Sequence, residues 1–413
     1  MQGLHLTADL YQCTGSEQLM LDAQSIADLC RTQTQASGLT LVDEKWVKFP
    51  DWQGQPGGVT GAVLLAESHL AIHTWPETGN VTIDVYVCNF SGDNSGKAKA
   101  LMEGVIQAYA PTQVVHQQLW RGDIAPDGQA LAPWVMEQLT PDASFGFRAT
   151  GIQRRQTPYQ SLEMMDTASF GRVMRLDHCF MTSERDEFFY HECMAHPAAI
   201  AHPDPRKALI IGGGDGGLAE ELLKHRSMQR VVLAELDEAV IEASKAELEK
   251  VHRNVWQDPR LQVRIGDGMA FIDQTEEQFD LLIMDLTDPD TPAGSLYEAA
   301  ALQRMRRVLA PGGALVLHLG SPVFHAEQVR QLSATLHGLF AHVRCYGVYV
   351  PLYGAYWGMA VCSDSLDAKA LTPEQVQQRL QERGIQDLQY YNPEVHGALF
   401  ALPNYYAQLV TKA

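Results

Sequence analysis

The stretch that decides the fold reads Lys207-Ala208-Leu209-Ile210-Ile211-Gly212-Gly213-Gly214-Asp215-Gly216-Gly217-Leu218-Ala219-Glu220. Its apolar run predicts a buried β-strand, and the glycines that follow predict a tight turn at the start of a helix. After Pro205, similar strands alternate with helical patterns, which predicts a parallel sheet wound with helices. The turn satisfies Gly-x-Gly-x-x-Gly, a motif that serves nicotinamide, flavin and S-adenosylmethionine sites alike.

Three acidic side chains near this turn narrow the kind of ligand. A second predicted strand ends at Glu235, where a carboxylate can accept hydrogen bonds from both ribose hydroxyls, and Asp267 follows a third strand. Asp215 lies within the glycine turn, where its charge would repel a pyrophosphate and attract an ammonium group. Together these residues favour a nucleoside that carries no phosphate groups.

Separated motifs across residues 130–413 give this part of the chain a family resemblance. In order, they are Thr157-Pro158-Tyr159-Gln160, Asp186-Glu187-Phe188-Phe189-Tyr190-His191-Glu192, the glycine turn, Met284-Asp285-Leu286-Thr287-Asp288-Pro289, Pro351-Leu352-Tyr353 and Tyr390-Tyr391-Asn392-Pro393-Glu394-Val395-His396. With these motifs the chain resembles spermidine synthases, which transfer an aminopropyl group from decarboxylated S-adenosylmethionine to a diamine and release methylthioadenosine. The resemblance implies a donor site formed by Gln160, His191, Asp215, Glu235 and Asp267.

This reaction needs a base, because a free alkylamine has a pKa of about 10 and arrives protonated at neutral pH. The resemblance implies that Asp285 is the base, with Asp288 beside it and Tyr353 across the pocket. Without the motif, Asp285 is equally typical of an aspartate that caps a strand-to-helix turn.

Four positions depart from the family pattern, and all lie on the acceptor side. His178 and Met181 stand where the family usually has glycine and glutamine. Thr291 replaces a glycine, and Gly354 stands where a proline often follows the tyrosine. Since the donor residues match, putrescine is the default acceptor, and an acceptor other than putrescine is the alternative.

The stretch Ala66-Glu67-Ser68-His69-Leu70-Ala71-Ile72-His73-Thr74-Trp75-Pro76-Glu77 carries a second resemblance. It is similar to the self-cleavage site of bacterial S-adenosylmethionine decarboxylase proenzymes. The resemblance implies that the Ser68 hydroxyl attacks the carbonyl of Glu67, that the bond between them breaks, and that Ser68 becomes a pyruvoyl group. His73 matches the family histidine that assists the elimination, and Thr60 matches a small hydroxyl residue that also aids processing.

Further residues of this region match those that handle an adenosyl substrate. The resemblance assigns to Cys88 the protonation of the substrate carbon, to Trp75 the adenine ring and to Glu77 the ribose hydroxyls. Turn residues between Pro76 and Asn80 predict a strand pair that folds Cys88 back beside the serine. A lone cysteine in an alternating strand is more commonly a small buried hydrophobe, so the ordered set carries the resemblance.

Composition limits the remaining function classes. The chain has 413 residues, 46% hydrophobic and 20% charged, which suits two or three packed domains. Its formal net charge of -19 argues against nucleic acid, which needs clustered lysine and arginine. Seven cysteines without a Cys-x-x-Cys pair predict free thiols, and the lack of a signal or long apolar span predicts a soluble cytoplasmic protein that does not bind membranes. His191 and His196 have no third ligand at metal-site spacing, so no metal is predicted.

The patterns divide the chain into four segments. Residues 1–125 are expected to form an α+β pyruvoyl decarboxylase domain, with helical patterns near Glu17–Gln35 and Gly96–Ala108. Residues 126–149 are expected to be a linker and lead-in, because turn residues gather near Pro126. A small β domain is expected in 150–203, and an α/β Rossmann-like aminopropyltransferase domain in 204–413.

The two resemblances support one interpretation, since the product of the first enzyme is the donor of the second. We therefore predict a bifunctional polyamine-biosynthetic fusion, a homodimer by analogy with both families. One alternative is that the first domain decarboxylates ornithine or arginine, against which Trp75 and Glu77 argue. A methyltransferase is a second alternative, but Asp215 would sit badly beside the carboxylate of intact S-adenosylmethionine. A polyamine-binding sensor is disfavoured because Ser68, Cys88 and Asp285 are all present.

Overall fold

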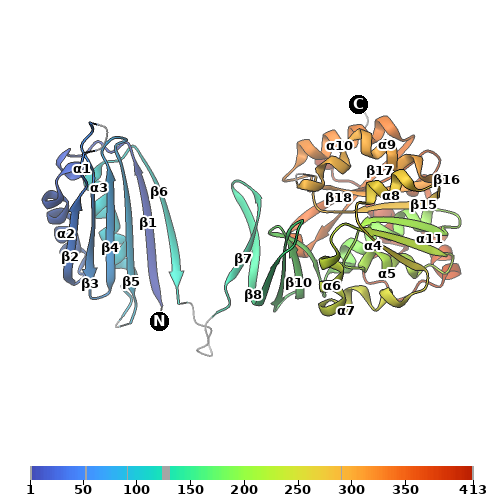
Figure 1. The fold of residues 1–413 in the computed structure, drawn as a ribbon, viewed down its shortest axis with the longest axis horizontal. Helices are drawn as coiled ribbons and strands as arrows, with labels where there is room; N and C mark the ends of the chain where they lie inside the picture. The colour runs from blue at the N-terminus through green and yellow to red at the C-terminus, as the bar shows by residue number, and fades with distance from the viewer. Residues whose placement is uncertain (1, 52–53, 91, 123–130, 290, 412–413) are drawn as a thin grey trace. The chain divides into compact units, whose positions relative to one another are not determined.

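The computed structural model describes residues 2–51, 54–90, 92–122, 131–289 and 291–411. The chain divides into two compact units, residues 1–131 and 132–413 (Figure 1). The linker expected near Pro126 lies among residues 123–130, outside the described residues. No helix in the described ranges is long and apolar enough to span a membrane.

The first unit is an α+β fold of two layers. Its antiparallel sheet has the strand order β2-β3-β4-β5-β1-β6. The strands are β1 (Gly3–Tyr11), β2 (Leu41–Lys48), β3 (Val59–Leu65), β4 (Ser68–Trp75), β5 (Asn80–Cys88) and β6 (Gln113–Arg121). The helices are α1 (Gln18–Leu21), α2 (Ala23–Ser37) and α3 (Ser95–Tyr109), which lie where the helical patterns predicted them.

Helices α2 and α3 cover one face of this sheet. Along β5, buried side chains alternate with half-buried ones, and the buried set packs with helix residues such as Ile26 and Leu101. The strand register places the half-buried set on the opposite side of the sheet. We call this side, which faces away from the helices, the open face. It carries His5, Thr60, Leu64, His69, His73, Trp75, Asp84, Tyr86, Cys88 and Leu119.

The second unit contains two sheets. One is antiparallel, in the order β11-β10-β9-β8-β7, and the other has seven strands in the order β14-β13-β12-β15-β16-β18-β17. The first five strands of the larger sheet run parallel, and β18 pairs antiparallel with both of its neighbours. The strands are β7 (Trp134–Thr140), β8 (Ala143–Gln156), β9 (Ser161–Thr167), β10 (Gly171–Leu176), β11 (Cys179–Ser183), β12 (Lys207–Gly212), β13 (Arg230–Glu235), β14 (Leu261–Ile265), β15 (Phe279–Asp285), β16 (Leu309–Gly320), β17 (His342–Val350) and β18 (Ala355–Ser363).

Helices lie on both faces of the larger sheet (Figure 1). They are α4 (Glu187–Ala201), α5 (Gly217–Leu223), α6 (Glu238–Glu247), α7 (Glu249–His252), α8 (Gly268–Gln274), α9 (Ala299–Arg307), α10 (Ala326–Leu339), α11 (Pro373–Arg383), α12 (Pro393–Leu399) and α13 (Asn404–Val410). Successive residues of β12 therefore enter different cores: Ile210 packs in one, and Leu209 and Ile211 pack in the other. Burial on both sides explains why this strand reads as an unbroken apolar run.

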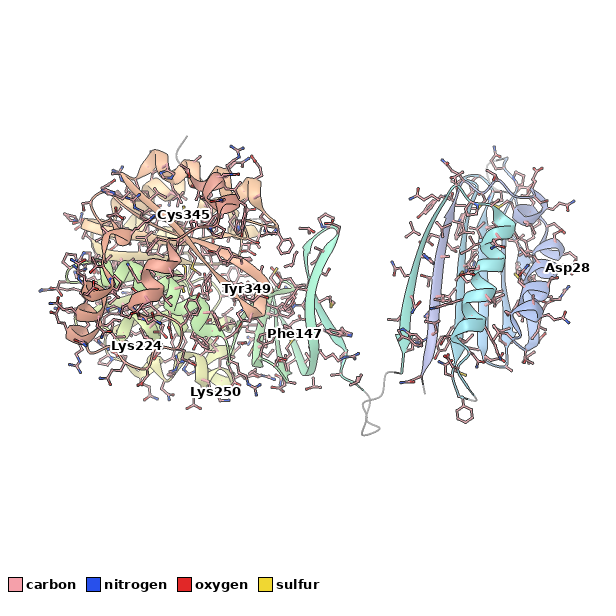
Figure 2. All side chains as sticks on the ribbon, turned by 180° about the vertical axis from the view of Figure 1, so that it is seen from behind. Asp28, Phe147, Lys224, Lys250, Cys345 and Tyr349 are labelled. Carbon is pink, nitrogen blue, oxygen red and sulfur yellow. The ribbon has the colours of Figure 1, made fainter. Side chains whose placement is uncertain are left out.

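The structure differs from the expected linker and small domain in residues 126–149 and 150–203. The range 131–149 holds β7 and the first part of β8, which pair with each other. Figure 2 labels Phe147, which lies in β8. Its ring packs at a tilt against Phe180, with 4.4 Å between ring centroids, and belongs to the same apolar core as Ile210. The five-stranded sheet shares this core with the larger sheet, so a separate small β domain is not confirmed.

Candidate active sites

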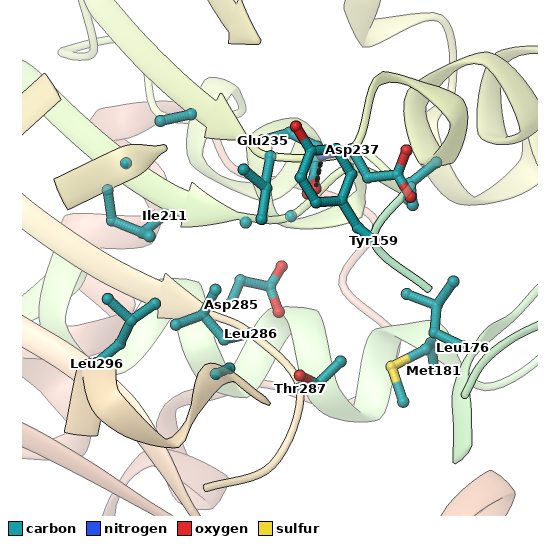
Figure 3. A pocket seen from close by; sticks show the side chains of 18 of the residues that line it. Tyr159, Leu176, Met181, Ile211, Glu235, Asp237, Asp285, Leu286, Thr287 and Leu296 are labelled. Carbon is teal, nitrogen blue, oxygen red and sulfur yellow. Dashed lines mark hydrogen bonds between the residues drawn. The ribbon is translucent and has the colours of Figure 1, made fainter. Parts of the chain in front are cut away.

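A cavity of about 600 Å³ opens at the carboxyl ends of β12, β13 and β15. Figure 3 shows Tyr159, Glu235 and Asp237 at one side of it and Asp285 and Thr287 at the other. The cavity is lined by seven of the residues predicted from the sequence, namely Gln160, His191, Asp215, Glu235, Asp267, Asp285 and Tyr353. Asp288 instead lines a second cavity of about 30 Å³, and Met181 and Tyr353 line both.

The glycine turn lets the Glu235 carboxylate approach the backbone closely. A Cβ atom on Gly214 would lie 2.9 Å from Glu235 Oε2, so any larger residue would displace the carboxylate. The backbone N–H of Asp237 donates to Glu235 Oε1 at 2.9 Å and fixes its orientation. Burial raises the pKa of Glu235 to about 7. This carboxylate is placed to accept hydrogen bonds from the hydroxyls of a ligand.

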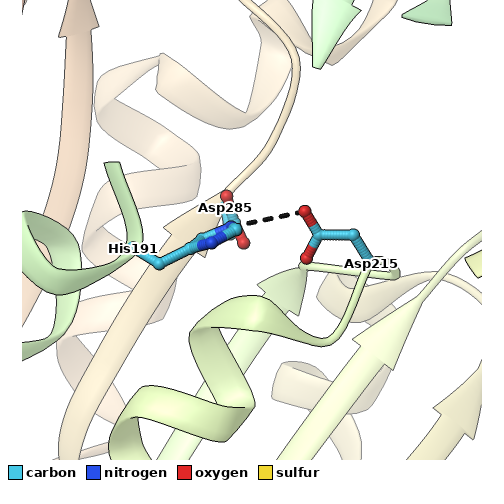
Figure 4. Close-up of side chains that lie close together, drawn as sticks. All are labelled: His191, Asp215 and Asp285. Carbon is cyan, nitrogen blue, oxygen red and sulfur yellow. Dashed lines mark ion pairs between the residues drawn. The ribbon is translucent and has the colours of Figure 1, made fainter. Parts of the chain in front are cut away.

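His191 lies in a buried chain of charges beneath the cavity. Its Nδ1 is 2.8 Å from Glu187 Oε2, and its Nε2 is 3.3 Å from Asp215 Oδ2 (Figure 4). Burial lowers the pKa of the His191 ring, but the two carboxylates outweigh it and leave that pKa well above its ordinary value. Burial raises the pKa of Asp215, but the charge of the His191 ring and its hydrogen bond lower it by more. The net pKa of Asp215 therefore lies below its ordinary value. These shifts favour the charged form of the His191 ring and the carboxylate form of Asp215.

Asp285, like Glu235, has a pKa that suits proton transfer at neutral pH. Burial and then the nearby Asp215 carboxylate raise the pKa of Asp285 to about 7, against the opposing effects of His191 and a hydrogen bond from Tyr190. A base with a pKa near the working pH is the most effective for general base catalysis. The role of Asp285 as the base stays a prediction, and a pKa of about 7 is compatible with it.

His191, Asp215 and Asp285 also form a cluster whose ligand-type atoms all lie within 4.8 Å of one another. Sequence spacing could not reveal it, because its members come from α4, from the turn after β12 and from the end of β15. One imidazole and two carboxylates are metal-ligand types. The two carboxylates of the cluster would also attract an organic cation.

Tyr353, predicted to lie on the acceptor side, has several contacts that fix its position. Its hydroxyl donates to the carbonyl oxygen of Met181 at 2.8 Å, and its ring packs on Trp357 with centroids 5.0 Å apart. The buried Asp186 accepts from the backbone N–H of Leu352 at 2.7 Å and so holds the turn that carries the tyrosine. Asp288 Oδ1 lies 3.7 Å from His318 Nδ1 in the smaller cavity.

Sequence reasoning missed several residues that shape the cavity. Asp237 accepts from the side chains of Gln160 at 3.0 Å and Thr157 at 2.7 Å, and it also caps α6. Tyr159 lines the cavity, and Glu187 orients the histidine of the charge chain. The signals were in the motifs, since Tyr159 lies in the quoted Thr-Pro-Tyr-Gln segment and Asp237 comes two residues after Glu235.

In the first unit, Ser68 begins β4 directly after the turn that follows β3. Its φ of 154° lies outside the region that side-chain-bearing residues normally adopt, which indicates local strain. The carbonyl oxygen of Glu67 accepts from the backbone N–H of Cys88 at 2.8 Å. Since Ser68 also pairs with Val87, the predicted turn does bring Cys88 beside the serine.

Thr60 and His73 lie together, but away from Ser68. His73 Nδ1 is 2.6 Å from Thr60 Oγ1, and the two residues pair across β3 and β4. Five residues of extended strand separate His73 from Ser68, a distance of about 16 Å. The exposed Trp75 and Glu77 lie beyond His73, at the end of β4 and in the turn that follows. One copy of the unit thus carries two clusters, one at each end of β4.

Comparison with known proteins assigns both units. The S-adenosylmethionine decarboxylase family model matches residues 4–122. The spermidine synthase tetramerisation domain matches residues 153–184, and the spermine/spermidine synthase domain matches residues 187–371.

Relatives and solved structures agree for the second unit. The polyamine aminopropyltransferase of Nitrosomonas europaea is 47% identical over 280 residues, which cover 68% of this chain and 86% of the relative. Polyamine aminopropyltransferase 1 of Pseudomonas aeruginosa is 40% identical over 258 residues, or 62% of this chain and 90% of that one. A crystal structure of a spermidine synthase in complex with the transition-state analogue AdoDATO has a TM-score of 0.64 and 31% identity, covering 67% of this chain and 94% of its own. The chain therefore belongs to the polyamine aminopropyltransferase family and carries an S-adenosylmethionine decarboxylase domain ahead of the transferase.

Proposed function

We propose that this enzyme makes spermidine in two steps. The first unit decarboxylates S-adenosylmethionine with a pyruvoyl group formed from Ser68, and the second transfers the aminopropyl group of that product to putrescine. The observation that carries the proposal is the pairing of matches, since one family makes the donor that the other consumes. Methylthioadenosine is the second product of the transfer.

The surroundings of Ser68 suit self-cleavage. The serine stands in a strained conformation next to the Glu67 carbonyl, whose oxygen already accepts from the Cys88 N–H. That N–H stabilises the negative charge that develops on the oxygen when the hydroxyl attacks. A pyruvoyl carbonyl condenses with the amine of the substrate and takes up the electrons left when carbon dioxide departs. Cys88 would then supply the proton, and Trp75 and Glu77 would hold the adenosine.

We further propose that two copies of the first unit share their sites. Within one copy, Ser68 and His73 lie about 16 Å apart, which is too far for contact. A second copy that packs on the open face can bring its own Thr60–His73 pair to the serine. The open face also exposes apolar side chains, with Leu64 50%, Trp75 40% and Leu119 61% exposed. Exposed apolar patches of this kind mark contact surfaces. Dimerisation through the open face would thus complete both sites, while the match to a tetramerisation domain concerns residues 153–184.

Co-expression of two variants tests the shared site. Ser68→Ala and His73→Ala should each remain uncleaved alone. When they are produced together in equal amounts, about half of the His73→Ala chains should be cleaved, because random pairing puts half of them beside an intact His73. Mass spectrometry of differently tagged chains gives the fraction. No cleavage in the mixture would show that the histidine acts within its own chain or not at all.

In the second unit, we assign each group of the cavity a step in the transfer. Glu235 would accept from the ribose hydroxyls, and Asp215 would hold the ammonium group of the donor beside its charged partner His191. Gln160 and Asp267 complete the donor site. Asp285 would bind the attacking amine, remove its proton and align it with the carbon next to the sulfonium. Asp288 and Tyr353 would hold the rest of the diamine.

Met181 favours a test of acceptors other than putrescine. This apolar side chain lines both cavities at a position where the family resemblance has a polar glutamine. A change from polar to apolar lining alters which amine chain fits, because an amine nitrogen loses a hydrogen-bond partner there.

Product analysis tests the proposed function as a whole. Purified protein should show two chains in denaturing mass spectrometry, divided between Glu67 and Ser68, with the larger blocked by a pyruvoyl group. Given S-adenosylmethionine and a panel of diamines, it should release carbon dioxide and form spermidine from putrescine. A single uncleaved mass in active protein would refute the cofactor, and preference for another amine would replace putrescine.

A further inference from the structure

A chain of polar groups runs from Ser68 across three strands of the open face. Ser68 Oγ lies 3.1 Å from His69 Nδ1. His69 Nε2 lies 3.3 Å from Asp84 Oδ1, and the second oxygen, Asp84 Oδ2, lies 2.7 Å from His5 Nε2. The groups come from β4, β5 and β1, so the sheet itself fixes their spacing.

The chemistry of the chain sets the direction of its hydrogen bonds. An ionised carboxylate can only accept, so the His69 nitrogen that faces Asp84 carries the ring proton. This leaves the lone pair of Nδ1 directed at the serine hydroxyl. The ring of Tyr86 lies against both histidines, with centroids 6.0 Å from His69 and 5.6 Å from His5, and limits their rotation. A serine, a histidine and a carboxylate in this order form an activated nucleophile in unrelated enzymes.

We propose that His69 is the base that starts self-cleavage, with Asp84 and His5 as positioning residues. The inference rests on the proposed formation of a pyruvoyl group from Ser68. The Ser68 Oγ–H bond breaks and its proton passes to His69 Nδ1, while Oγ forms a bond to the carbonyl carbon of Glu67. The proton then passes to the Ser68 nitrogen as the peptide C–N bond breaks. The product is an ester between Glu67 and the serine oxygen, with a free amino group, and His69 is neutral again.

This assignment gives His69 and His73 roles in different steps of self-cleavage. His69 acts before the ester exists, whereas the family resemblance gives His73 the later elimination. Their variants should therefore accumulate different species. Without His69 the intact peptide bond persists, and without His73 the ester builds up. Hydroxylamine distinguishes the two, because it cleaves an ester and leaves a peptide bond intact.

The test follows freshly synthesised protein in mass spectra with and without hydroxylamine. His69→Ala should slow cleavage by about 10²-fold or more, the usual scale for a positioned base, and the uncleaved chain should resist hydroxylamine. Imidazole in the buffer should restore part of the rate, which a merely structural role would not allow. Asp84→Asn should also slow the first step of cleavage, although the imidazole ring of His69 is still present. If His69→Ala fails to fold, the Asp84→Asn variant tests the role of His69 in its place.

A matched control is His116→Ala, since His116 lies on the same sheet in the edge strand β6 and pairs with Ala8. Its cleavage should match that of the native chain. If His69→Ala is cleaved at the native rate, or accumulates a hydroxylamine-sensitive ester, His69 is not the base of the first step. If the native chain itself is never cleaved, the proposed pyruvoyl function fails instead, so the two failures are distinguishable.

Discussion

Ser68→Ala is expected to abolish both chain cleavage and decarboxylation of S-adenosylmethionine. Alanine has no hydroxyl to attack the Glu67 carbonyl and no oxygen to leave in the elimination, so the pyruvoyl group cannot form. The same variant should still make polyamine when decarboxylated S-adenosylmethionine is supplied, because every residue of the 600 Å³ cavity belongs to the second unit. Carbon dioxide release and amine products measure the two activities separately.

Ser37→Ala provides the control for this experiment. Ser37 ends α2, on the helical side of the same unit, and its hydroxyl donates to the backbone of Thr34. Cleavage and both activities should be native in this variant. If Ser68→Ala remains folded and yet fails with supplied donor, maturation couples the two units, and the view of two independent enzymes on one chain is wrong.

Asp285→Asn is expected to reduce aminopropyl transfer by about 10²-fold or more while carbon dioxide release stays native. The amide has the shape of the carboxylate but cannot take a proton from the amine. In the native enzyme the pKa of Asp285 lies at about 7, and only the ionised form is the base. At saturating donor, the plot of kcat/KM for the amine against pH should therefore change slope at about pH 7, and the asparagine variant should lack this change of slope.

Asp364→Asn provides the control for this experiment, and titration of Glu235 is the competing explanation for the pH dependence. Asp364→Asn removes an exposed carboxylate that pairs with Arg306, outside the cavity, and should leave transfer unchanged. Near-native transfer by Asp285→Asn would remove Asp285 from the mechanism. A change of slope at about pH 7 that persists in that variant would assign the titration to Glu235, whose pKa also lies at about 7.

The convergence of the residues proposed to bind the donor could be predicted from the sequence for a physical reason. Carboxyl ends of parallel strands meet at one edge, so acidic residues after successive strands converge there. Asp215, Glu235 and Asp267 follow this rule, and all three line the cavity. The electrostatic partnership with His191 could not be predicted, because it depends on a helix that reaches the turn from elsewhere in the chain.

The first unit shows where sequence proximity misleads. Ser68 and His73 are five residues apart, which suggests one site, but an extended strand carries them to opposite ends of β4. The reverse holds for His5, Asp84 and His69, which are far apart in sequence and in contact in the sheet. In both cases the register of the strands determines which side chains meet, and this register is set only when all the strands have paired.

The strands on either side of residue 150 show a similar limit. Val135 and Phe147 look like parts of a short lead-in, yet they are buried in a core that includes Ile210 and Leu233. A sequence pattern can show that a strand has a buried face, but it does not show which other strands share that core.

The strand order of the first unit gives cleavage after Glu67 an unusual mechanical consequence. The nick would leave β1, β2 and β3 on a short polypeptide and β4, β5 and β6 on a long one. In the sheet these strands are interleaved, since β1 of the short piece lies between β5 and β6 of the long piece, and β3 borders β4. The two polypeptides are thus held together by the sheet's hydrogen bonds and core without a covalent link, and neither can dissociate unless the sheet unfolds.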